Sequence, residues 1–293
     1  MKSKPMPTND EILLRRTKMA EMGFVVQQTY KTRELTGLRA EWHQSWLDVG
    51  FPTKVSNDED MLADVAYLSE FTGNPDFIET YNQLFDIVQK SDFWRYAKLY
   101  LEGGLYADVD IIAHPGMYDL VMDFLHSNDE MIAFWESYQY LGWFGLYFHL
   151  DSMVRYPQYR QCIMVVKTPM HPVYLRALEN IVDQMKTKRY LRFSGLARTL
   201  ELTGPGVYTD AVNYYFSQEG KPGLLMTKYR SEAPQYFEHV GTGVWKIEKH
   251  LGTTERISIF FFFLLWVGFV GGLCWYRLKR WKMKNKKNKV FAK

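Results

Sequence analysis

A run of twenty residues without a charged side chain, 257–276, constrains this chain more than any other feature. As a helix rising about 1.5 Å per residue, it matches the ~30 Å hydrocarbon core of a bilayer. Trp275 and Tyr276 stand where interfacial aromatic residues lie, and a cationic run follows. A buried core helix is the alternative, which the polybasic end disfavours. We therefore expect one transmembrane helix over 257–276.

This span predicts the domain organisation. We expect a polar leader or short helix over 1–20, one large domain over 21–250, the span, and a basic tail over 277–293. The tail holds nine Lys or Arg and no acid, so a chain of net charge +3 has a body of net charge −6. Because the basic residues form one terminal run, the basic pI gives no support to nucleic-acid binding.

The orientation in the membrane is open. The positive-inside rule places the tail in the cytosol and the preceding domain in a lumen or outside. The first 23 residues contain no apolar stretch of the kind found in a signal peptide, which favours a cytosolic body instead.

The two cysteines, Cys162 and Cys274, are too few for a disulfide framework or a multi-cysteine zinc site.

Helical and strand patterns alternate along the body. Apolar runs predict strands, and capping or periodic patterns predict helices; Asn57 is the expected N-cap of one of them. With no internal repeat, this alternation predicts a mixed α/β domain with a mostly parallel sheet. The expected strands are 23–30, 51–56, 105–112 and 162–167, and the expected helices are 38–49, 57–69, one from 74, 89–102, 172–185 and 207–216.

Two carboxylates in the expected strand 105–112 carry the chemistry. Asp108 and Asp110 are two positions apart, so they share one face of a strand with Tyr106. Ligands bind at strand ends in open α/β sheets, and paired carboxylates suit a hard cation such as Mn²⁺ or Mg²⁺. An isolated Asp-x-Asp occurs about once by chance in a chain of this composition, so the context decides.

That context is the helix before the strand. Asp92 and Arg95 lie on one helix face, and Gly103-Gly104 allows a sharp turn into the strand. Alone, this pair would be an ordinary surface ion pair. Before a Gly-Gly-x-Tyr-x-Asp-x-Asp run, the pair could supply a carboxylate for sugar hydroxyls and a guanidinium.

Several motifs accompany this run in a fixed order. Together, over residues 23–246, they resemble the DXD-motif sugar transferases (glycosyltransferase family 32-like), which include fungal initiating alpha-mannosyltransferases and inositolphosphoceramide mannosyltransferases. The matching segments are QTYKT at 28–32, SW at 45–46, DED at 58–60, the run 92–110, TGPG at 203–206 and HVGTGVW at 239–245.

The resemblance implies a GT-A (Rossmann-like nucleotide-sugar-binding) fold and a retaining transfer. It implies that Asp108 and Asp110 are catalytic, that Asp110 is the principal metal ligand, and that Asp108 and His239 also approach the metal. The implied donor-binding residues are Gln28, Thr29, Asp92, Arg95, Tyr106, Asp108 and Trp245.

The resemblance also implies the cofactor and the substrates. These are Mn²⁺ or Mg²⁺ and a nucleotide-sugar, with GDP-mannose favoured and a UDP-sugar as the alternative. Trp245 precedes the span by twelve positions, about 40 Å of extended chain, which favours a glycan or membrane-lipid acceptor such as a sphingolipid. We expect a single-pass membrane protein of the Golgi or endoplasmic reticulum with a lumenal catalytic domain.

Two departures motivate a different reading. Gln27 stands where the family has His, and Val244 where it has Ser. A non-catalytic GT-A-like membrane subunit that assists a partner transferase is therefore the alternative. A metal-dependent phosphohydrolase would need more ligands than the sequence offers. His171, before Pro172, is expected to be a structural residue at a helix start.

Overall fold

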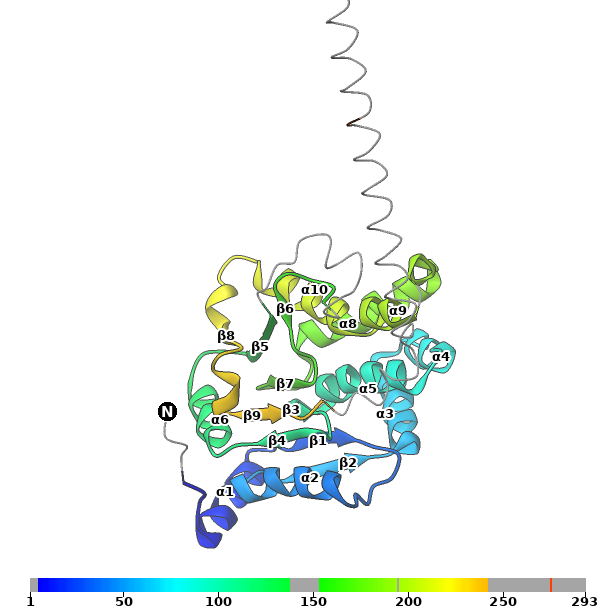
Figure 1. Cartoon of the computed structure of the whole chain (residues 1–293). Helices are drawn as coiled ribbons and strands as arrows, with labels where there is room; N and C mark the ends of the chain where they lie inside the picture. The colour runs from blue at the N-terminus through cyan, green and yellow to red at the C-terminus, as the bar shows by residue number, and fades with distance from the viewer. Residues whose placement is uncertain (1–4, 138–152, 194, 242–274, 276–293) are drawn as a thin grey trace, which may run out of the picture. The chain divides into compact units, whose positions relative to one another are not determined.

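The computed structural model describes residues 5–137, 153–193, 195–241 and 275 (Figure 1). The chain divides into units 1–245 and 246–293, and all the elements below belong to the first. Apart from Trp275, the expected span 257–276 lies outside the described residues, as does Trp245. Within the described part, no helix is long and apolar enough to cross a membrane.

The helices and strands follow the expected alternation. The helices are α1 (Asn9–Glu21), α2 (Leu38–Val49), α3 (Asp58–Thr72), α4 (Asp76–Gln83), α5 (Ile87–Glu102), α6 (Gly116–His126), α8 (Pro172–Lys186), α9 (Gly195–Leu202) and α10 (Pro205–Phe216), with a short 3-10 helix η1 (Arg189–Arg192). The strands are β1 (Val26–Thr29), β2 (Thr53–Ser56), β3 (Gly104–Ala107), β4 (Ile111–Ala113), β5 (Met131–Ser137), β6 (Gln158–Tyr159), β7 (Ile163–Val166), β8 (Leu225–Lys228) and β9 (Phe237–His239).

Seven of the described strands form one sheet in the order β2-β1-β3-β7-β5-β6, with β8 beside β5. Strands β2, β1 and β3 are parallel, as is β8 to β5, whereas β7 is antiparallel to both β3 and β5. The expected mostly parallel sheet is therefore a mixed sheet, with three parallel pairings (β1 with β2, β1 with β3 and β5 with β8) and three antiparallel ones among the described strands. Strands β4 and β9 form a separate antiparallel pair.

Side chains alternate across the large sheet, and each face has its own core. Tyr106 and Met164 pack under α3, α5, α8 and α10. Leu105 and Val165 face the other way, toward α1, α2 and α6. Figure 1 shows the same layers, with α2 on one side of the sheet and α8 and α10 on the other. The domain is thus a mixed α/β fold of three layers.

Local chemistry explains where the helices begin and end. Asn57 accepts a hydrogen bond from the Asp60 amide, and the Asp60 side chain accepts one from the Asn57 amide, so α3 starts with a capping box. This confirms Asn57 as an N-cap. Helix α2 ends at Gly50 and α3 at Gly73, both in the left-handed region that favours glycine.

The expected strand 105–112 is wrong. The chain leaves the sheet after Ala107, turns through Asp108 and Asp110, and enters β4 at Ile111. The Asp108 amide donates to the Cys162 carbonyl at 2.8 Å, and the Ile111 amide donates to the Asp108 carbonyl at 3.0 Å. The first bond extends the pairing of β3 with β7 by one residue, and the second closes the turn. Strand β4 then pairs with β9 rather than with a strand of the large sheet.

Candidate active site

The Asp108-Val109-Asp110 turn connects β3 of the large sheet to β4 of the small one. Two tightly packed glycines, Gly103 and Gly104, stand at the start of β3. Gly103 and Gly104 have φ values of 69° and 86°. A Cβ atom would stand 3.0 Å from the Pro169 nitrogen at Gly103, and 3.0 Å from the Val25 carbonyl oxygen at Gly104. Both positions therefore require glycine.

Arg95 organises the base of this turn. Its Nη1 atom lies 3.3 Å from Asp108 Oδ1 and donates to the Gln161 carbonyl at 2.9 Å, and its guanidinium lies over the Tyr106 ring. The Tyr106 hydroxyl donates to the same Asp108 oxygen at 2.5 Å. The Asp108 carboxylate is thus fixed through Oδ1, and neither of these contacts uses Oδ2.

Asp92 lies deeper, below Arg95. Its side chain is 2% exposed and contacts Arg95 Nη2 at 2.9 Å. It also accepts hydrogen bonds from the Gln161 amide at 2.9 Å and from the Thr203 hydroxyl at 2.8 Å. Burial raises the pKa of this carboxyl to about 7, while Arg95 and Thr203 oppose the shift. In the structure Asp92 thus holds Arg95 in place, and direct sugar binding by Asp92 stays a prediction.

His239 reaches the turn from the far end of the chain. It is paired with Ile111 across β4 and β9, and its Nε2 atom lies 3.5 Å from Asp110 Oδ1. The Val240 amide donates to the Asp110 carbonyl at 3.1 Å. The hydrogen bond to Asp110 raises the pKa of His239. The structure therefore brings together Asp108, Asp110 and His239, which the motifs only ordered along the chain.

Gln28 approaches the same turn from β1. Its amide donates to the Asp108 carbonyl at 3.5 Å, and its Oε1 atom contacts His43 Nδ1 at 2.6 Å. The other ring nitrogen of His43 contacts the Thr53 hydroxyl at 3.0 Å. His43, which the sequence did not single out, therefore orients Gln28. Thr29 instead donates to the Ser56 carbonyl, which ties its hydroxyl to β2.

Gln27 points away from the turn. Its side chain is 2% exposed and donates to Glu102 at 2.8 Å, on the face of β1 opposite Gln28. The departure from the family pattern at this position therefore does not touch Asp108 or Asp110. The second departure, Val244, lies outside the described residues.

The Ser45-Trp46 motif on α2 holds β4 in place. The buried Trp46 indole donates to the Ile111 carbonyl at 3.0 Å, and the Ser45 hydroxyl accepts from the Ala113 amide at 2.9 Å. These bonds replace strand pairing on the second edge of β4. The sequence motif included both residues without assigning them a role. The structure shows that they position β4.

The side chains at the turn suit a cation that takes its remaining ligands from a bound substrate. Among the described residues, no three His, Cys, Asp or Glu side chains converge tightly enough to hold a metal ion by themselves. Asp110 and His239 provide a carboxylate and an imidazole beside each other, and the Asp108 carboxylate belongs to the same turn. Mg²⁺ and similar hard cations are commonly held by one or two carboxylates together with substrate phosphates.

The comparisons with known proteins find similarity to glycosyltransferases. Residues 32–139 match the family model described as "Glycosyltransferase sugar-binding region containing DXD motif". The chain is 28% identical to the "Putative glycosyltransferase HOC1" of Saccharomyces cerevisiae over 182 residues, which are 60% of this chain and 44% of that protein. It is 23% identical to the "Uncharacterized glycosyltransferase L373" of Acanthamoeba polyphaga mimivirus over 141 residues, which are 48% of this chain and 45% of that protein.

The chain thus spans less than half the length of these two curated relatives. Among solved structures, the PaToxG glycosyltransferase is similar with a TM-score of 0.45 and 15% identity, over 85% of this chain and 88% of that one. The resemblance first read from the motifs is confirmed over the segment that holds Asp108 and Asp110. Residues 32–139 are thus similar to the DXD-containing sugar-binding region of glycosyltransferases.

Proposed function

We propose that this chain is a metal-dependent, retaining glycosyltransferase of the GT-A type. It moves a hexose, with mannose favoured, from a nucleotide-sugar to a glycan or membrane-lipid acceptor. The observation that carries the proposal is the Asp108–Asp110 turn, which sits in the matched segment and meets His239 from the opposite end of the domain.

The two carboxylates of the turn have different proposed roles. Asp110 and His239 would hold Mn²⁺ or Mg²⁺, which when bound neutralises the charge that develops on the leaving nucleoside diphosphate. Arg95 and Tyr106 keep Asp108 in a fixed orientation beside the donor. Gln28, held by His43, presents its amide at the same edge of the sheet.

The donor class is argued from the relatives and the location from the sequence. The name of the yeast relative describes a glycosyltransferase, which is consistent with a nucleotide-sugar donor. GDP-mannose is our first choice of donor and a UDP-sugar the second. The uncharged run 257–276 supports a membrane anchor, and we propose a lumenal domain in the Golgi or endoplasmic reticulum with an acceptor such as a sphingolipid.

The full chain in detergent, supplied with GDP- and UDP-sugars, tests the proposal through release of the nucleoside diphosphate. We expect release from one donor with Mn²⁺, none with EDTA, and none from Asp110→Asn. Asp58→Asn is the matched control, because Asp58 belongs to the Asp58-Glu59-Asp60 run in the first turn of α3. A folded chain that releases nothing from any donor would overturn the proposal and favour the non-catalytic subunit.

A further inference from the structure

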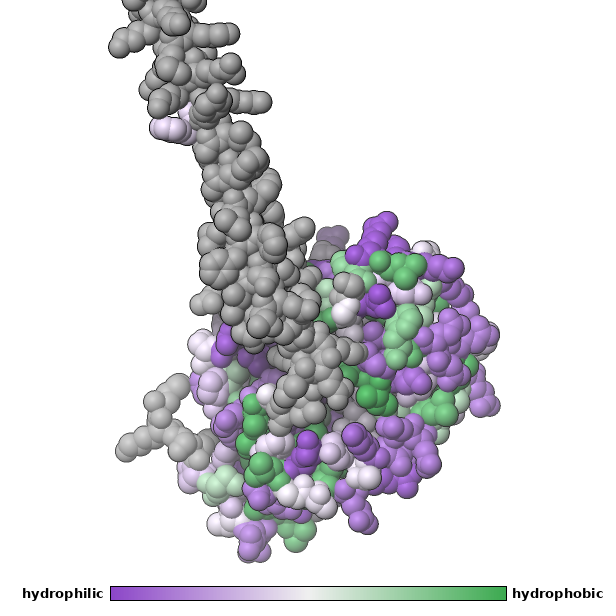
Figure 2. All heavy atoms as spheres, turned by 45° about the vertical axis from the view of Figure 1, so that its right-hand side comes forward, coloured by the Kyte–Doolittle hydropathy of each residue, from purple (hydrophilic) through white to green (hydrophobic). Residues whose placement is uncertain are grey.

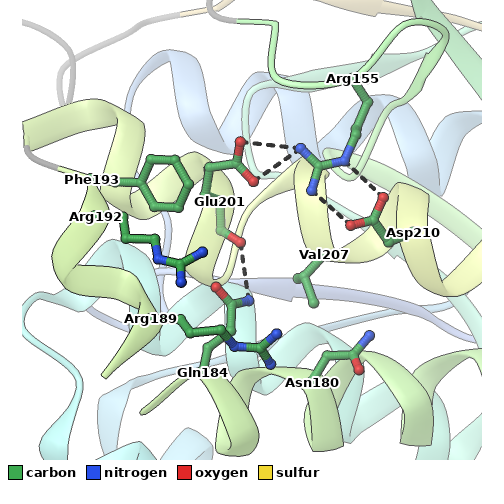
Figure 3. Close-up of a pocket in the computed structure, with 9 residues that line it drawn as sticks. All are labelled: Arg155, Asn180, Gln184, Arg189, Arg192, Phe193, Glu201, Val207 and Asp210. Carbon is green, nitrogen blue, oxygen red and sulfur yellow. Dashed lines mark hydrogen bonds and ion pairs between the residues drawn. The ribbon is translucent and has the colours of Figure 1, made fainter. Parts of the chain in front are cut away.

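A second hollow lies away from the Asp108–Asp110 turn, among α8, η1, α9 and α10 (Figure 3). Its volume is about 290 Å³. That volume lies at the lower end of small-molecule sites, which range over ~300–1,000 Å³. The hollow therefore suits a ligand with about one ring rather than an extended chain.

One wall of the hollow is an ion-paired network centred on Arg155. The guanidinium donates to Asp210 through Nε and Nη2, both at 2.7 Å, and to the two Glu201 oxygens through Nη1 at 3.1 and 3.0 Å. The Glu201 side chain is 13% exposed. Two carboxylates and one guanidinium are thus held in fixed positions at the surface of the hollow.

The facing wall carries planar amides. Gln184 donates through its Nε2 atom to the Glu201 backbone carbonyl at 3.3 Å, which fixes the plane of its amide. Asn180 lies one turn earlier on α8 and is half-buried. Figure 3 shows both amides at the hollow, opposite the carboxylates that Arg155 holds.

Most charged side chains of the hollow are ion-paired. Arg155 is offset by Glu201 and Asp210, and Arg189 is bonded to Asp183, just outside the lining. The lining itself holds three guanidinium groups, those of Arg155, Arg189 and Arg192, and two carboxylates, those of Glu201 and Asp210. Because two of the three guanidinium groups are ion-paired, the lining offers an anion such as phosphate little attraction.

The chemistry of the lining matches a polyol. The amides, guanidinium groups and carboxylates of the lining can donate to and accept from neighbouring hydroxyls, and the half-buried Phe193 offers an aromatic ring beside them. We propose that this hollow binds a neutral sugar ring. If the proposed function holds, on which this assignment rests, the ring belongs to the acceptor glycan.

One loop joins the hollow to the donor side. Glu201 and Val207, which line the hollow, flank residues 203–206. Thr203 in this loop donates to Asp92, the carboxylate that holds Arg95. A sugar seated in the hollow would therefore contact residues that flank the loop from which Thr203 reaches Asp92.

Saturation-transfer NMR on the full chain in detergent tests the assignment, with the methyl glycosides of mannose, glucose, galactose and N-acetylglucosamine as probes. We expect at least one glycoside to bind, and Asn180→Ala and Arg192→Ala to weaken that binding about tenfold. The matched controls Glu179→Ala and Lys188→Ala, at exposed neighbouring positions outside the lining, should bind as the natural chain does.

Three results would overturn the assignment: no glycoside binds, binding is unchanged in both lining variants, or inorganic phosphate displaces the glycoside. The Asp110→Asn variant separates this test from the previous one. It should keep glycoside binding, because the hollow does not contain Asp110. A chain that binds a glycoside and releases no nucleotide refutes the proposed function alone, whereas one that transfers sugar without this binding refutes the sugar site alone.

Discussion

At the scale of single residues, Arg95 is the side chain on which the site depends most. Its side chain is 7% exposed, and it contacts Asp92, Asp108 and the Gln161 carbonyl. Although burial favours the neutral form, the surrounding carboxylates hold the pKa of Arg95 above its usual value. Such a buried cation fixes the geometry of the turn, and its removal strongly lowers the free energy of unfolding.

Arg95→Met should lower the free energy of unfolding by about 3–5 kcal/mol, because it leaves the Asp92 carboxylate buried without a cation. Asp92→Asn in the same chain should recover part of that loss. Arg33→Met is the matched control: Arg33 is 62% exposed where it pairs with Asp60, so we expect a change of about 0–1 kcal/mol. Urea unfolding measures all four chains, and equal losses for Arg95→Met and Arg33→Met would contradict this account.

At the scale of elements, the Thr203-Gly204-Pro205-Gly206 loop sets how closely α9 and α10 pack. A Cβ atom at Gly204 would stand 2.7 Å from the Leu200 Cα atom and 2.8 Å from the Leu200 carbonyl oxygen. Both are backbone atoms of α9, so they cannot rotate away.

Gly204→Ala should therefore destabilise the domain by about 1–3 kcal/mol, as overpacking does. It should also reduce donor turnover, because Thr203 would no longer reach Asp92. Gly223→Ala is the control, since a Cβ atom there meets nothing within 4 Å. Thermal unfolding of the two variants provides the comparison, and equal midpoints would refute the packing argument.

His171 gives α8 a pH-sensitive start. Its Nδ1 atom accepts from the Val173 amide at 3.3 Å, and its Nε2 atom lies 3.2 Å from Glu130, which also meets Tyr215 and Lys221. Pro172 occupies the first turn of α8. This confirms the structural role expected for His171. The Nδ1 bond requires the neutral ring, and burial lowers the pKa of His171.

The sign of the pH effect follows from that lowered pKa. Just below pH ~6.5 the unfolded chain binds a proton at this residue and the folded chain does not, so stability falls as the pH drops. His171→Asn keeps an N-cap acceptor without the titration. We expect the urea midpoint of the natural chain to fall more between pH 7.5 and 5.5 than that of the variant. Parallel curves for the two chains would contradict this role.

At the scale of the whole molecule, local signals predicted much of the fold. The helix predicted over 38–49 is α2, and the strand and helix predicted over 162–167 and 172–185 agree with β7 and α8 within about one residue. The capping residues and apolar runs that predict these elements lie within the elements or next to them in the sequence. Asp108 and Asp110 were found the same way, because the Gly-Gly pair and the preceding helix lie next to them in the sequence.

The missed features depend on contacts between distant residues. The pairing of β4 with β9 joins Ile111 to His239, and it turns the expected strand 105–112 into two strands and a turn. His43, Trp46 and Gln161 act through hydrogen bonds to segments 15 to 69 positions away. Neither periodicity nor capping encodes such contacts, so only the order of the motifs hinted at them.

The most direct test of the central claim is Mn²⁺ binding by the full chain, measured by electron paramagnetic resonance with and without GDP. Because the turn and β9 offer Asp110 and His239 rather than a complete ligand set, we predict weak Mn²⁺ binding alone and much tighter binding with GDP. Asp110→Asn should abolish that gain, and Asp58→Asn should preserve it. Binding that is independent of GDP, or equal in both variants, would contradict the claim that this turn is where a cation and a nucleotide-sugar meet.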